Sequence, residues 1–323
     1  MPDFDAAPAP DFDEIVARDQ GLSCFPESEF ARHRIQRIDL SGNQIQSFPD
    51  WLAELAALRV LRLDANHLEE IPASLFGLPR LEELWLDANR LRSLSAGVGR
   101  MASLKILSAY ANAIETVPPE LGDLAGLENL TLGRNRLTSI PEFLFQLRNL
   151  RVLNLAENAL TSVSESIGNL SELTMLDLGH NRIDSLPDDI GELSALSDFL
   201  YLSHNRLAFL PATIGRLTRL RYFNATHNRL RELPEELGGM ARLIELRLHD
   251  NQLDRLPDSL GRLTRLSELH LSNNRLLVFP ESMTRLTALT HLDFRNNQLR
   301  AIPDSIENLT ELRHLDLRGN RID

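Results

Sequence analysis

The chain has very few of the residues that cross-link or react in small proteins. Among its 323 residues are one cysteine, Cys24, and one lysine, Lys105. A single cysteine excludes an internal disulfide framework and fits a reducing compartment. Two explanations for the scarcity of lysine stay open. One is a GC-rich genome, and the other is protection from lysine-directed modification inside a host cell.

Long apolar runs and an excess of positive charge are also missing. No uninterrupted apolar stretch approaches the roughly 20 residues that a membrane-spanning helix requires. The start, MPDFDAAPAPDFDE, is acidic and is not a secretory signal. A net charge of −12 and a pI near 5.3 argue against nucleic acid and anionic membranes as partners. We expect no membrane insertion and a cytoplasmic protein, or one delivered into a host cytosol if it is a bacterial effector.

Asparagine, by contrast, recurs at a fixed interval. Successive asparagines are 23 residues apart, except for one step of 24 that ends at Asn205. A repeat of this length indicates units that bury their apolar faces only by stacking on their neighbours, and therefore one elongated domain. The amide group suits a role in bonding backbone groups where the chain turns. We therefore interpret thirteen asparagines as an internal ladder: Asn43, Asn66, Asn89, Asn112, Asn135, Asn158, Asn181, Asn205, Asn228, Asn251, Asn274, Asn297 and Asn320.

The pattern around each asparagine predicts its local structure. In the unit 124–147, Leu130 and Leu132 alternate with polar residues before Asn135, which indicates a short strand. Pro141 then precedes apolar residues at every third position, which suits a 3₁₀ or helical turn. Each unit is thus predicted to be a strand, a turn and a short helical segment. Stacked units would place a parallel sheet on one face and helical turns on the other.

The consensus LxxLxLxxNxLxxLPxxIxxLxxL resembles the leucine-rich repeat in its 23-residue, intracellular Ras-group form. The segment LTMLDLGHNRIDSLPDDIGEL (173–193) matches it closely, and the resemblance covers about residues 35–323. It implies an α/β solenoid of about thirteen repeats, a horseshoe with a concave parallel sheet and a convex side of short helical or 3₁₀ segments. It also implies protein binding and no reaction. Four residues depart from the consensus: Ser95 and Ser164 replace the proline, and Ala109 and Ala225 replace a strand leucine.

The two ends of the repeat array differ. Residues 15–34 still follow the period in part and are predicted to form a degenerate N-terminal cap, because a bare end would expose the core. An acidic, flexible tail is expected at 1–14, and the leucine-rich repeats at 35–323. No matching cap follows Asn320. We expect a partner, a second copy of the chain or a further domain to cover that end.

The sequence shows no recognisable catalytic motif. The sequence contains no GxxxxGK[ST], HExxH or nucleophile elbow. Cys24 lies in the apolar context LSCFP and is expected to pack in the cap. We therefore expect no enzymatic activity and no cofactor.

Side chains that point away from the core are where binding specificity can be encoded, since packing does not dictate them. The predicted outward positions lie seven, six, four, two and one residues before each asparagine. All three tyrosines and one of the two tryptophans fall there, and such rings are enriched among binding hot spots. Met175, Phe199 and Tyr222 are predicted to share one column on three successive strands.

Histidine is concentrated in the second half, with seven of nine at 180–314. His180, His204 and His227 precede three consecutive asparagines, so their strands are predicted to be about 4.8 Å apart. Neighbouring imidazoles can share a metal ion, but no carboxylate or cysteine completes the set in the sequence. We predict a hydrogen-bonding stripe and no metal site. The predicted partner-binding residues are Trp85, Tyr110, Met175, Asp177, His180, Phe199, Tyr201, His204, Tyr222, Asn224, His227 and Arg247.

The one 24-residue step has two interpretations. Leu200 and Leu202 keep their usual distances to Asn205, so the extra residue lies within Ser197-Asp198-Phe199. It is either a tolerated loop insertion or a bulge that re-aims Phe199 and its neighbours. We favour the bulge as part of a binding patch.

Two functions fit the sequence. The first is a non-enzymatic module that binds a protein or peptide on its concave face. The alternative is the substrate-recognition arm of a larger enzyme, such as an effector-type ubiquitin ligase or a kinase, with its catalytic domain outside this chain.

Overall fold

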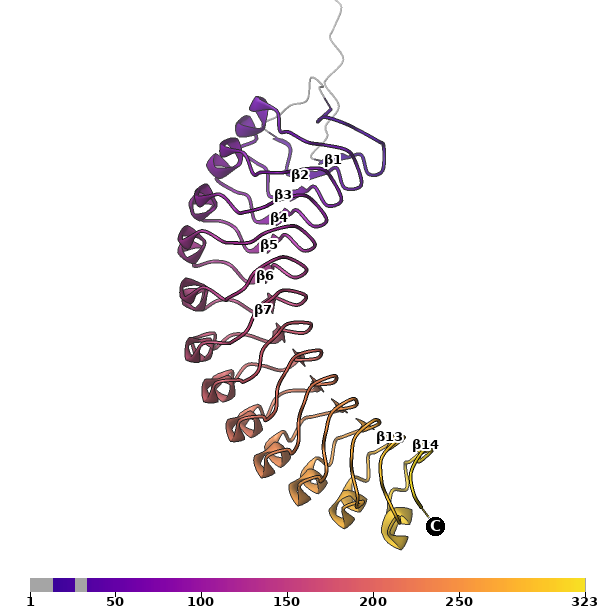
Figure 1. Cartoon of the computed structure of the whole chain (residues 1–323). Coiled ribbons are helices and arrows are strands. Elements are labelled where there is room, and N and C mark those ends of the chain that lie inside the picture. The colour runs from indigo at the N-terminus through magenta and orange to yellow at the C-terminus, as the bar shows by residue number, and fades with distance from the viewer. Residues whose placement is uncertain (1–13, 27–33, 323) are drawn as a thin grey trace, which may run out of the picture. The chain divides into compact units, whose positions relative to one another are not determined.

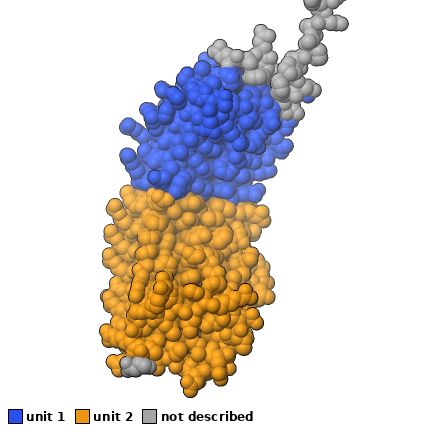
Figure 2. Space-filling model, turned by 90° about the vertical axis from the view of Figure 1, so that its right-hand side faces the viewer, with its two compact units in different colours: residues 1–136 blue, residues 137–323 orange. Residues whose placement is uncertain are grey.

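The structure, a computed structural model, describes residues 14–26 and 34–322. The chain divides into two compact units, residues 1–136 and 137–323, which Figure 2 shows in different colours. The predicted tail lies outside the described residues except for Glu14, which is the first residue of a strand. Residues 27–33 of the predicted cap also lie outside them.

Each unit is built on three-residue strands that run parallel and pair in chain order (Figure 1). Their short length follows from the repeat, because only the residues around the central leucine alternate between core and surface. The first unit contains β1 (Glu14–Val16), β2 (Arg37–Asp39), β3 (Val60–Arg62), β4 (Glu83–Trp85), β5 (Ile106–Ser108) and β6 (Asn129–Thr131). The second contains β7 (Val152–Asn154), β8 (Met175–Asp177), β9 (Phe199–Tyr201), β10 (Tyr222–Asn224), β11 (Glu245–Arg247), β12 (Glu268–His270), β13 (His291–Asp293) and β14 (His314–Asp316).

The opposite side of each unit carries five-residue 3₁₀ helices (Figure 1). No helix of the described residues is long and apolar enough to cross a membrane. In the first unit the helices are η2 (Asp50–Glu54), η3 (Ala73–Gly77), η4 (Ala96–Arg100) and η5 (Pro119–Asp123). In the second they are η6 (Glu142–Gln146), η7 (Glu165–Asn169), η8 (Asp188–Glu192), η9 (Ala212–Arg216), η10 (Glu235–Gly239), η11 (Asp258–Arg262), η12 (Glu281–Arg285) and η13 (Asp304–Asn308).

Proline begins most of these helices. Its carbonyl accepts the first i→i+3 bond, as in the 3.0 Å bond from the Ile214 amide to Pro211. Its fixed φ suits the entry to a helix. Where serine replaces proline, the hydroxyl caps the helix: Ser95 accepts from Gly97 N at 3.4 Å and Ser164 from Ser166 N at 3.2 Å. The predicted unit of strand, turn and 3₁₀ segment is therefore confirmed, and serine fills the missing role by a side-chain bond.

The asparagine ladder is internal, as predicted. Asn181 is 8% exposed, and its Oδ1 accepts a 3.0 Å bond from the Leu160 amide of the preceding repeat. Its Nδ2 donates to the carbonyls of Leu155 and Leu178, both at 3.0 Å. The Asn181 side chain thus links two repeats and closes the turn of its own repeat. It provides hydrogen-bond partners for backbone groups that have none in the β-sheet.

The residue directly before each ladder asparagine has a left-handed backbone. In the second unit, for example, φ is 53° at His180 and His204 and 52° at His227. Few residues other than glycine adopt this region, although asparagine, aspartate and histidine are enriched there. Neighbouring repeats hold the conformation, since the His204 amide donates to the Thr226 carbonyl at 2.9 Å. The side chains at this position therefore leave the turn in a fixed direction.

The extra residue lies where the spacing predicts it. The amides of Ser197 and Asp198 both donate to the Thr174 carbonyl, at 3.3 and 3.0 Å. On the other side, the Arg221 amide donates to Ser197 O at 3.1 Å. Ser197 thus takes the backbone hydrogen-bonding position that Thr174 and Arg221 hold in the adjacent repeats, and Asp198 is the additional residue. From Phe199 onward the register is regular.

Close packing between the 3₁₀ helices depends on glycine. A Cβ added at Gly215 of η9 would lie 1.9 Å from the Glu236 carbonyl oxygen of η10, a distance that no side chain tolerates. The same close approach occurs between Gly191 of η8 and Thr213 of η9, where the corresponding distance is 2.4 Å. Glycine at these places lets consecutive helices approach until their backbones touch.

In the N-terminal region, β1 pairs in parallel with β2, with Ile15 opposite Ile38. Phe25 is 3% exposed and lies 5.6 Å from the Phe48 ring and 6.0 Å from the Trp51 ring. Cys24 is exposed, so the prediction that it packs in the cap is wrong. Phe25 is the buried residue of this stretch, whereas Ser23 and Cys24 lie in a bend with both side chains exposed.

Candidate functional site

Three aromatic rings meet on the outer surface of the sheet in the second unit. Phe199 lies nearly parallel to Tyr201, with ring centroids 5.5 Å apart and planes 9° from parallel. Tyr222 contacts both, at 5.4 Å from Phe199 and 5.2 Å from Tyr201. Phe199 is 37% exposed, and the two tyrosines are half-buried. We call these three residues the aromatic cluster.

Strand register explains why the rings meet. Met175, Phe199 and Tyr222 are Cα partners on β8, β9 and β10, so the predicted shared column is confirmed. Tyr201 extends the group because it lies two residues after Phe199, on the same face of β9. Its own Cα partners are Asp177 and Asn224, and Asn224 pairs in turn with Arg247.

Beside the aromatic cluster is a hollow of about 250 Å³. It lies where β9, β10 and β11 begin, so each repeat contributes the residue before its strand and the first residue of the strand. Ile244 at its edge is 37% exposed, as is Phe199. The hollow therefore offers apolar surface with charged groups around it, and it is lined by Asp198, Phe199, Arg221, Tyr222, Ile244 and Glu245.

Charged side chains frame the aromatic cluster on its β11 side. The Arg247 guanidinium lies 5.5 Å from the centre of the Tyr222 ring, within the range of a cation–π contact. Arg247 also donates to Glu245, whose Oε1 lies 3.9 Å from His270 Nε2. Burial and the Glu245 carboxylate raise the pKa of Tyr222 to about 12. Both its apolar surroundings and this charge therefore keep the Tyr222 hydroxyl protonated, as a hydrogen-bond donor.

Asp177 and Asn224 lie on either side of Tyr201 and are half-buried. Burial raises the pKa of Asp177, and a 2.9 Å bond from the Gly179 amide acts in the opposite direction. Burial and the Asp177 charge raise the pKa of Tyr201. Asn224 Oδ1 accepts a 3.0 Å bond from the Thr226 amide, so Asn224 shapes the end of its strand. Polar atoms thus surround the rings on both neighbouring strands.

The three predicted histidines form a stack at the turns that follow β8, β9 and β10. Ring centroids are 4.0 Å apart both between His180 and His204 and between His204 and His227. Burial lowers the pKa of His204, and charge on either neighbouring imidazole lowers it further. The prediction that these side chains lie side by side is confirmed. His249 continues the row at right angles, with its ring 5.6 Å from His227.

Trp85 and Tyr110 belong to the first unit, and each is half-buried. The Arg62 guanidinium lies 4.6 Å from the centre of the Trp85 ring, and Trp85 Nε1 donates to Glu83 at 3.0 Å. The Tyr110 amide donates to Asp87 Oδ1 at 2.7 Å. These residues form their own local arrangement on β4 and at the turn after β5 of the first unit.

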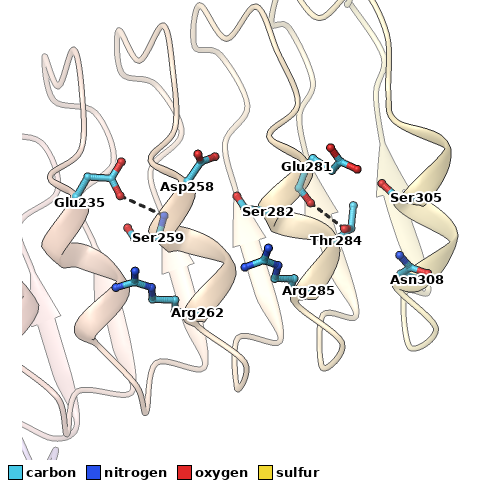
Figure 3. A pocket seen from close by; sticks show the side chains of 10 residues that line it. All are labelled: Glu235, Asp258, Ser259, Arg262, Glu281, Ser282, Thr284, Arg285, Ser305 and Asn308. Carbon is cyan, nitrogen blue, oxygen red and sulfur yellow. Dashed lines mark hydrogen bonds between the residues drawn. The ribbon is translucent and has the colours of Figure 1, made fainter.

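A larger hollow of about 650 Å³ lies on the helical side of the second unit (Figure 3). Glu235, Asp258 and Glu281 line one side of it, and Arg262 and Arg285 line the other. The Oγ atoms of three serines in equivalent places of successive repeats have no hydrogen-bond partner among the described residues: Ser259, Ser282 and Ser305. Its lining lacks the exposed rings of the sheet surface, so we centre the candidate site on the aromatic cluster.

Several residues of the site were missed from the sequence. Asp198, Arg221 and Ile244 line the hollow because they precede the strands, at the position seven before each asparagine. That position is among the predicted outward ones, but charged and aliphatic residues there, unlike tyrosine and tryptophan, do not by themselves indicate a binding site. Glu245 was missed as well, as was Asp250, whose Oδ2 lies 3.4 Å from His227 Nε2 of the histidine stack. The available signal for Asp250 was its position, because it directly precedes Asn251 as His227 directly precedes Asn228.

Comparison with known proteins agrees with the geometry. Residues 211–323 match the family described as a leucine-rich repeat region, and residues 34–55, 125–183 and 171–230 match leucine-rich repeat families. An LRR protein of Leptospira interrogans is 30% identical, with a TM-score of 0.81, over 97% of this chain and 91% of that one. The chain belongs to the leucine-rich repeat family, and its predicted solenoid of parallel strands and 3₁₀ segments is confirmed. No curated protein sequence matches it.

Two further structures are similar. One is an internalin of Listeria monocytogenes, with 19% identity and a TM-score of 0.81 over 94% of this chain and 86% of that one, which shows the fold alone. The other is the LRR ectodomain of the plant membrane receptor kinase GASSHO1/SCHENGEN3 from Arabidopsis thaliana, in complex with CASPARIAN STRIP INTEGRITY FACTOR 2. It is 28% identical, with a TM-score of 0.64, over 89% of this chain and 42% of that one.

Proposed function

We propose that the second unit binds an extended peptide or protein segment across the outer surface of strands β8–β11. The observation that carries this proposal is the aromatic cluster beside its hollow. Three rings in mutual contact, one of them 37% exposed, form a preorganised apolar anchor. Rigid aromatic surface of this kind contributes much contact area at low entropic cost.

The chemistry of the hollow suggests what it accepts. A volume of about 250 Å³ suits one large aliphatic or aromatic side chain, held between Phe199, Tyr222 and Ile244. Arg221 and Glu245 at the rim offer ion pairs of either sign, and the Tyr222 hydroxyl offers a donor. An extended segment would place alternate side chains toward the sheet, so one anchor and one polar contact fall two residues apart.

The known structures support this use of the fold. Leucine-rich repeat domains are typically protein- or peptide-binding modules without catalytic activity, and the Arabidopsis ectodomain is in complex with a separate factor. The additional residue Asp198 offers a reason for the position of the site. Asp198 lines the hollow, and Phe199, which follows it, is more exposed than its half-buried Cα partners Met175 and Tyr222.

The test begins with peptides selected from a random displayed library on the immobilised chain. The selected peptides should share a large apolar residue. Tyr222→Ala and Tyr201→Ala should each weaken their binding by about 1–3 kcal/mol, the range of aromatic hot spots. Calorimetric or fluorescence titration of one synthetic peptide with each variant measures this loss.

Tyr110→Ala is the matched control, because Tyr110 is a half-buried tyrosine of the first unit. It should leave the affinity unchanged. Peptides that bind Tyr222→Ala and Tyr201→Ala as tightly as the unchanged chain would contradict the proposal. Loss of binding in Tyr110→Ala alone would place the site in the first unit instead.

A further inference from the structure

Two imidazoles and a carboxylate converge at the turns that follow β10 and β11. His227 Nε2 lies 3.4 Å from Asp250 Oδ2, and His249 Nε2 lies 4.0 Å from the same oxygen. The ligand atoms of all three residues lie within 4.8 Å of one another. The histidine stripe predicted from the sequence lacked a carboxylate, and Asp250 supplies it from the next repeat.

These distances fit a small metal ion. In a tetrahedral zinc site with bonds of about 2.1 Å, two ligand atoms lie about 3.4 Å apart. His227 Nε2 is already at that distance from Asp250 Oδ2, and His249 Nε2, at 4.0 Å, needs only a small side-chain movement to reach it. Imidazole nitrogen and carboxylate oxygen are the usual ligands of zinc in sites that retain an open position. The side chains are 41%, 28% and 31% exposed for His227, His249 and Asp250, so an ion can reach them from solvent.

The carboxylate is oriented by a chain of amides. Asn273 Nδ2 donates to Asp250 Oδ1 at 2.8 Å, and Asn296 Nδ2 donates to Asn273 Oδ1 at 2.8 Å. Asp250 Oδ1 is therefore engaged, while Oδ2 faces the two imidazoles. Hydrogen bonds that orient a ligating carboxylate in this way are a regular feature of metal sites.

The backbone fixes two of the three ligands as well. His227 and Asp250 have left-handed φ values of 52° and 57°, and both occupy the position before a ladder asparagine. The His227 amide donates to the His249 carbonyl at 3.1 Å, and the Asp250 amide to the Ser272 carbonyl at 3.0 Å. Little rearrangement is needed to bring the ligand atoms together, so a bound ion retains most of its binding energy.

We propose that His227, His249 and Asp250 bind a divalent transition-metal ion, with zinc as the natural probe. Three protein ligands leave one coordination position open to water or to a side chain of a bound partner. The site is distinct from the proposed peptide contact at the aromatic cluster, because it lies at the turns after the strands. Its test requires no partner.

A second group of potential ligands, Glu245, Glu268 and His270, lies nearby. Arg247 donates to Glu245, and its permanent positive charge disfavours a cation there. We therefore assign the ion to the group with Asp250 and use this second group as a comparison.

The experiment titrates zinc into the chelator-stripped chain at pH 7.5, and calorimetry measures the binding. We expect about one strong site per chain, and cobalt at the same site should give a visible absorption band. His249→Gln and Asp250→Asn should each lower zinc affinity by at least about tenfold, because loss of outer contacts alone already costs that much. Asparagine at 250 tolerates the left-handed backbone and keeps an oxygen for Asn273, so that variant should fold.

His180→Asn is the matched control, because His180 occupies the same place in its repeat and belongs to the same stack, outside the ligand group. It should bind zinc as the unchanged chain does. Absence of a strong site in the unchanged chain would overturn the proposal. A strong site that survives both His249→Gln and Asp250→Asn would overturn it too, and its loss in His270→Gln would move the ion to the second group.

Discussion

The Phe199 ring meets the Tyr222 ring edge to face, with centroids 5.4 Å apart and planes at 62°. The two residues are 23 positions apart and are Cα partners on adjacent strands. Aromatic pairs in this geometry gain about 0.5–1.5 kcal/mol beyond the area they bury. The same contact leaves Phe199 partly exposed, so one pair of rings both stabilises two repeats and presents an anchor to a partner.

Deleting Asp198 should change binding more than stability. The deletion restores the 23-residue step, with Ser197 already in the ladder position and Leu200 and Asn205 unaffected. We expect a thermal midpoint close to that of the unchanged chain. Binding of the selected peptides should fall, because Phe199 is drawn back toward the sheet. Normal melting together with normal binding would show that the extra residue is a tolerated insertion without a role in the site.

Replacing a ladder asparagine should destabilise the fold. Asn181→Ala removes the acceptor of the Leu160 amide and the group that donates to the Leu155 and Leu178 carbonyls, so all three backbone groups lose a buried partner. The expected loss is about 1–3 kcal/mol of unfolding free energy, measured by urea denaturation. Asn169→Ala, at an exposed asparagine of η7, is the control and should change little. An unchanged urea midpoint for Asn181→Ala would contradict a structural role for the ladder.

A methyl group at Gly215 should force η9 and η10 apart. The added Cβ would lie 1.9 Å from the Glu236 carbonyl oxygen, which belongs to the backbone and cannot rotate away. Gly215→Ala should therefore cost about 1–3 kcal/mol, the range of overpacked sites. A Cβ at Gly77 of η3 meets nothing within 4 Å. Gly77→Ala should be neutral or slightly stabilising in the same urea measurement, and equal losses in the two variants would contradict the packing explanation.

Asp64 should make stability depend on pH. Burial raises the pKa of Asp64 to about 6, from an ordinary value of 3.8, and the nearby Asp87 carboxylate adds to the shift. Between these two values the folded state binds more protons than the unfolded state, so this group lowers stability as pH rises through that window. Above the folded-state pKa of about 6, Asp64 is ionised in both states, and the full cost of burying its charge opposes folding.

Asp64→Asn should therefore be more stable than the unchanged chain at pH 7.5, and the gain should shrink toward pH 3.5. Asparagine keeps an oxygen for the 3.0 Å bond from the Asp87 amide. Urea midpoints at the two pH values measure the difference between variant and unchanged chain. Asp254→Asn, at an exposed aspartate, is the control. A gain of the same size at both pH values would show that ionisation of Asp64 is not the cause.

The repeat could be predicted from the amino-acid pattern alone, because stacking imposes the same environment on the same position of every unit. The positions of Leu130, Leu132 and Asn135 have the same structural role in every repeat. A pattern that recurs thirteen times therefore predicts the strand, the turn and the asparagine ladder without knowledge of the folded chain. Even the place of the extra residue followed, since the leucines around it kept their distances to Asn205. The shared column of Met175, Phe199 and Tyr222 followed from the period for the same reason.

Side-chain contacts between repeats could not be predicted in this way and required the folded chain. Asp250 approaches His227 and His249 because the left-handed turn aims each side chain toward its neighbour, and a linear pattern does not contain that direction. The hollow beside Phe199 likewise depends on how the residues at the start of β9, β10 and β11 pack together. Exposure of Cys24 depended on the bend at Ser23 and Cys24, which leaves both side chains in solvent. The 23-residue period of the repeat determines which residues are neighbours, whereas the direction and packing of the side chains determine which of their atoms come into contact.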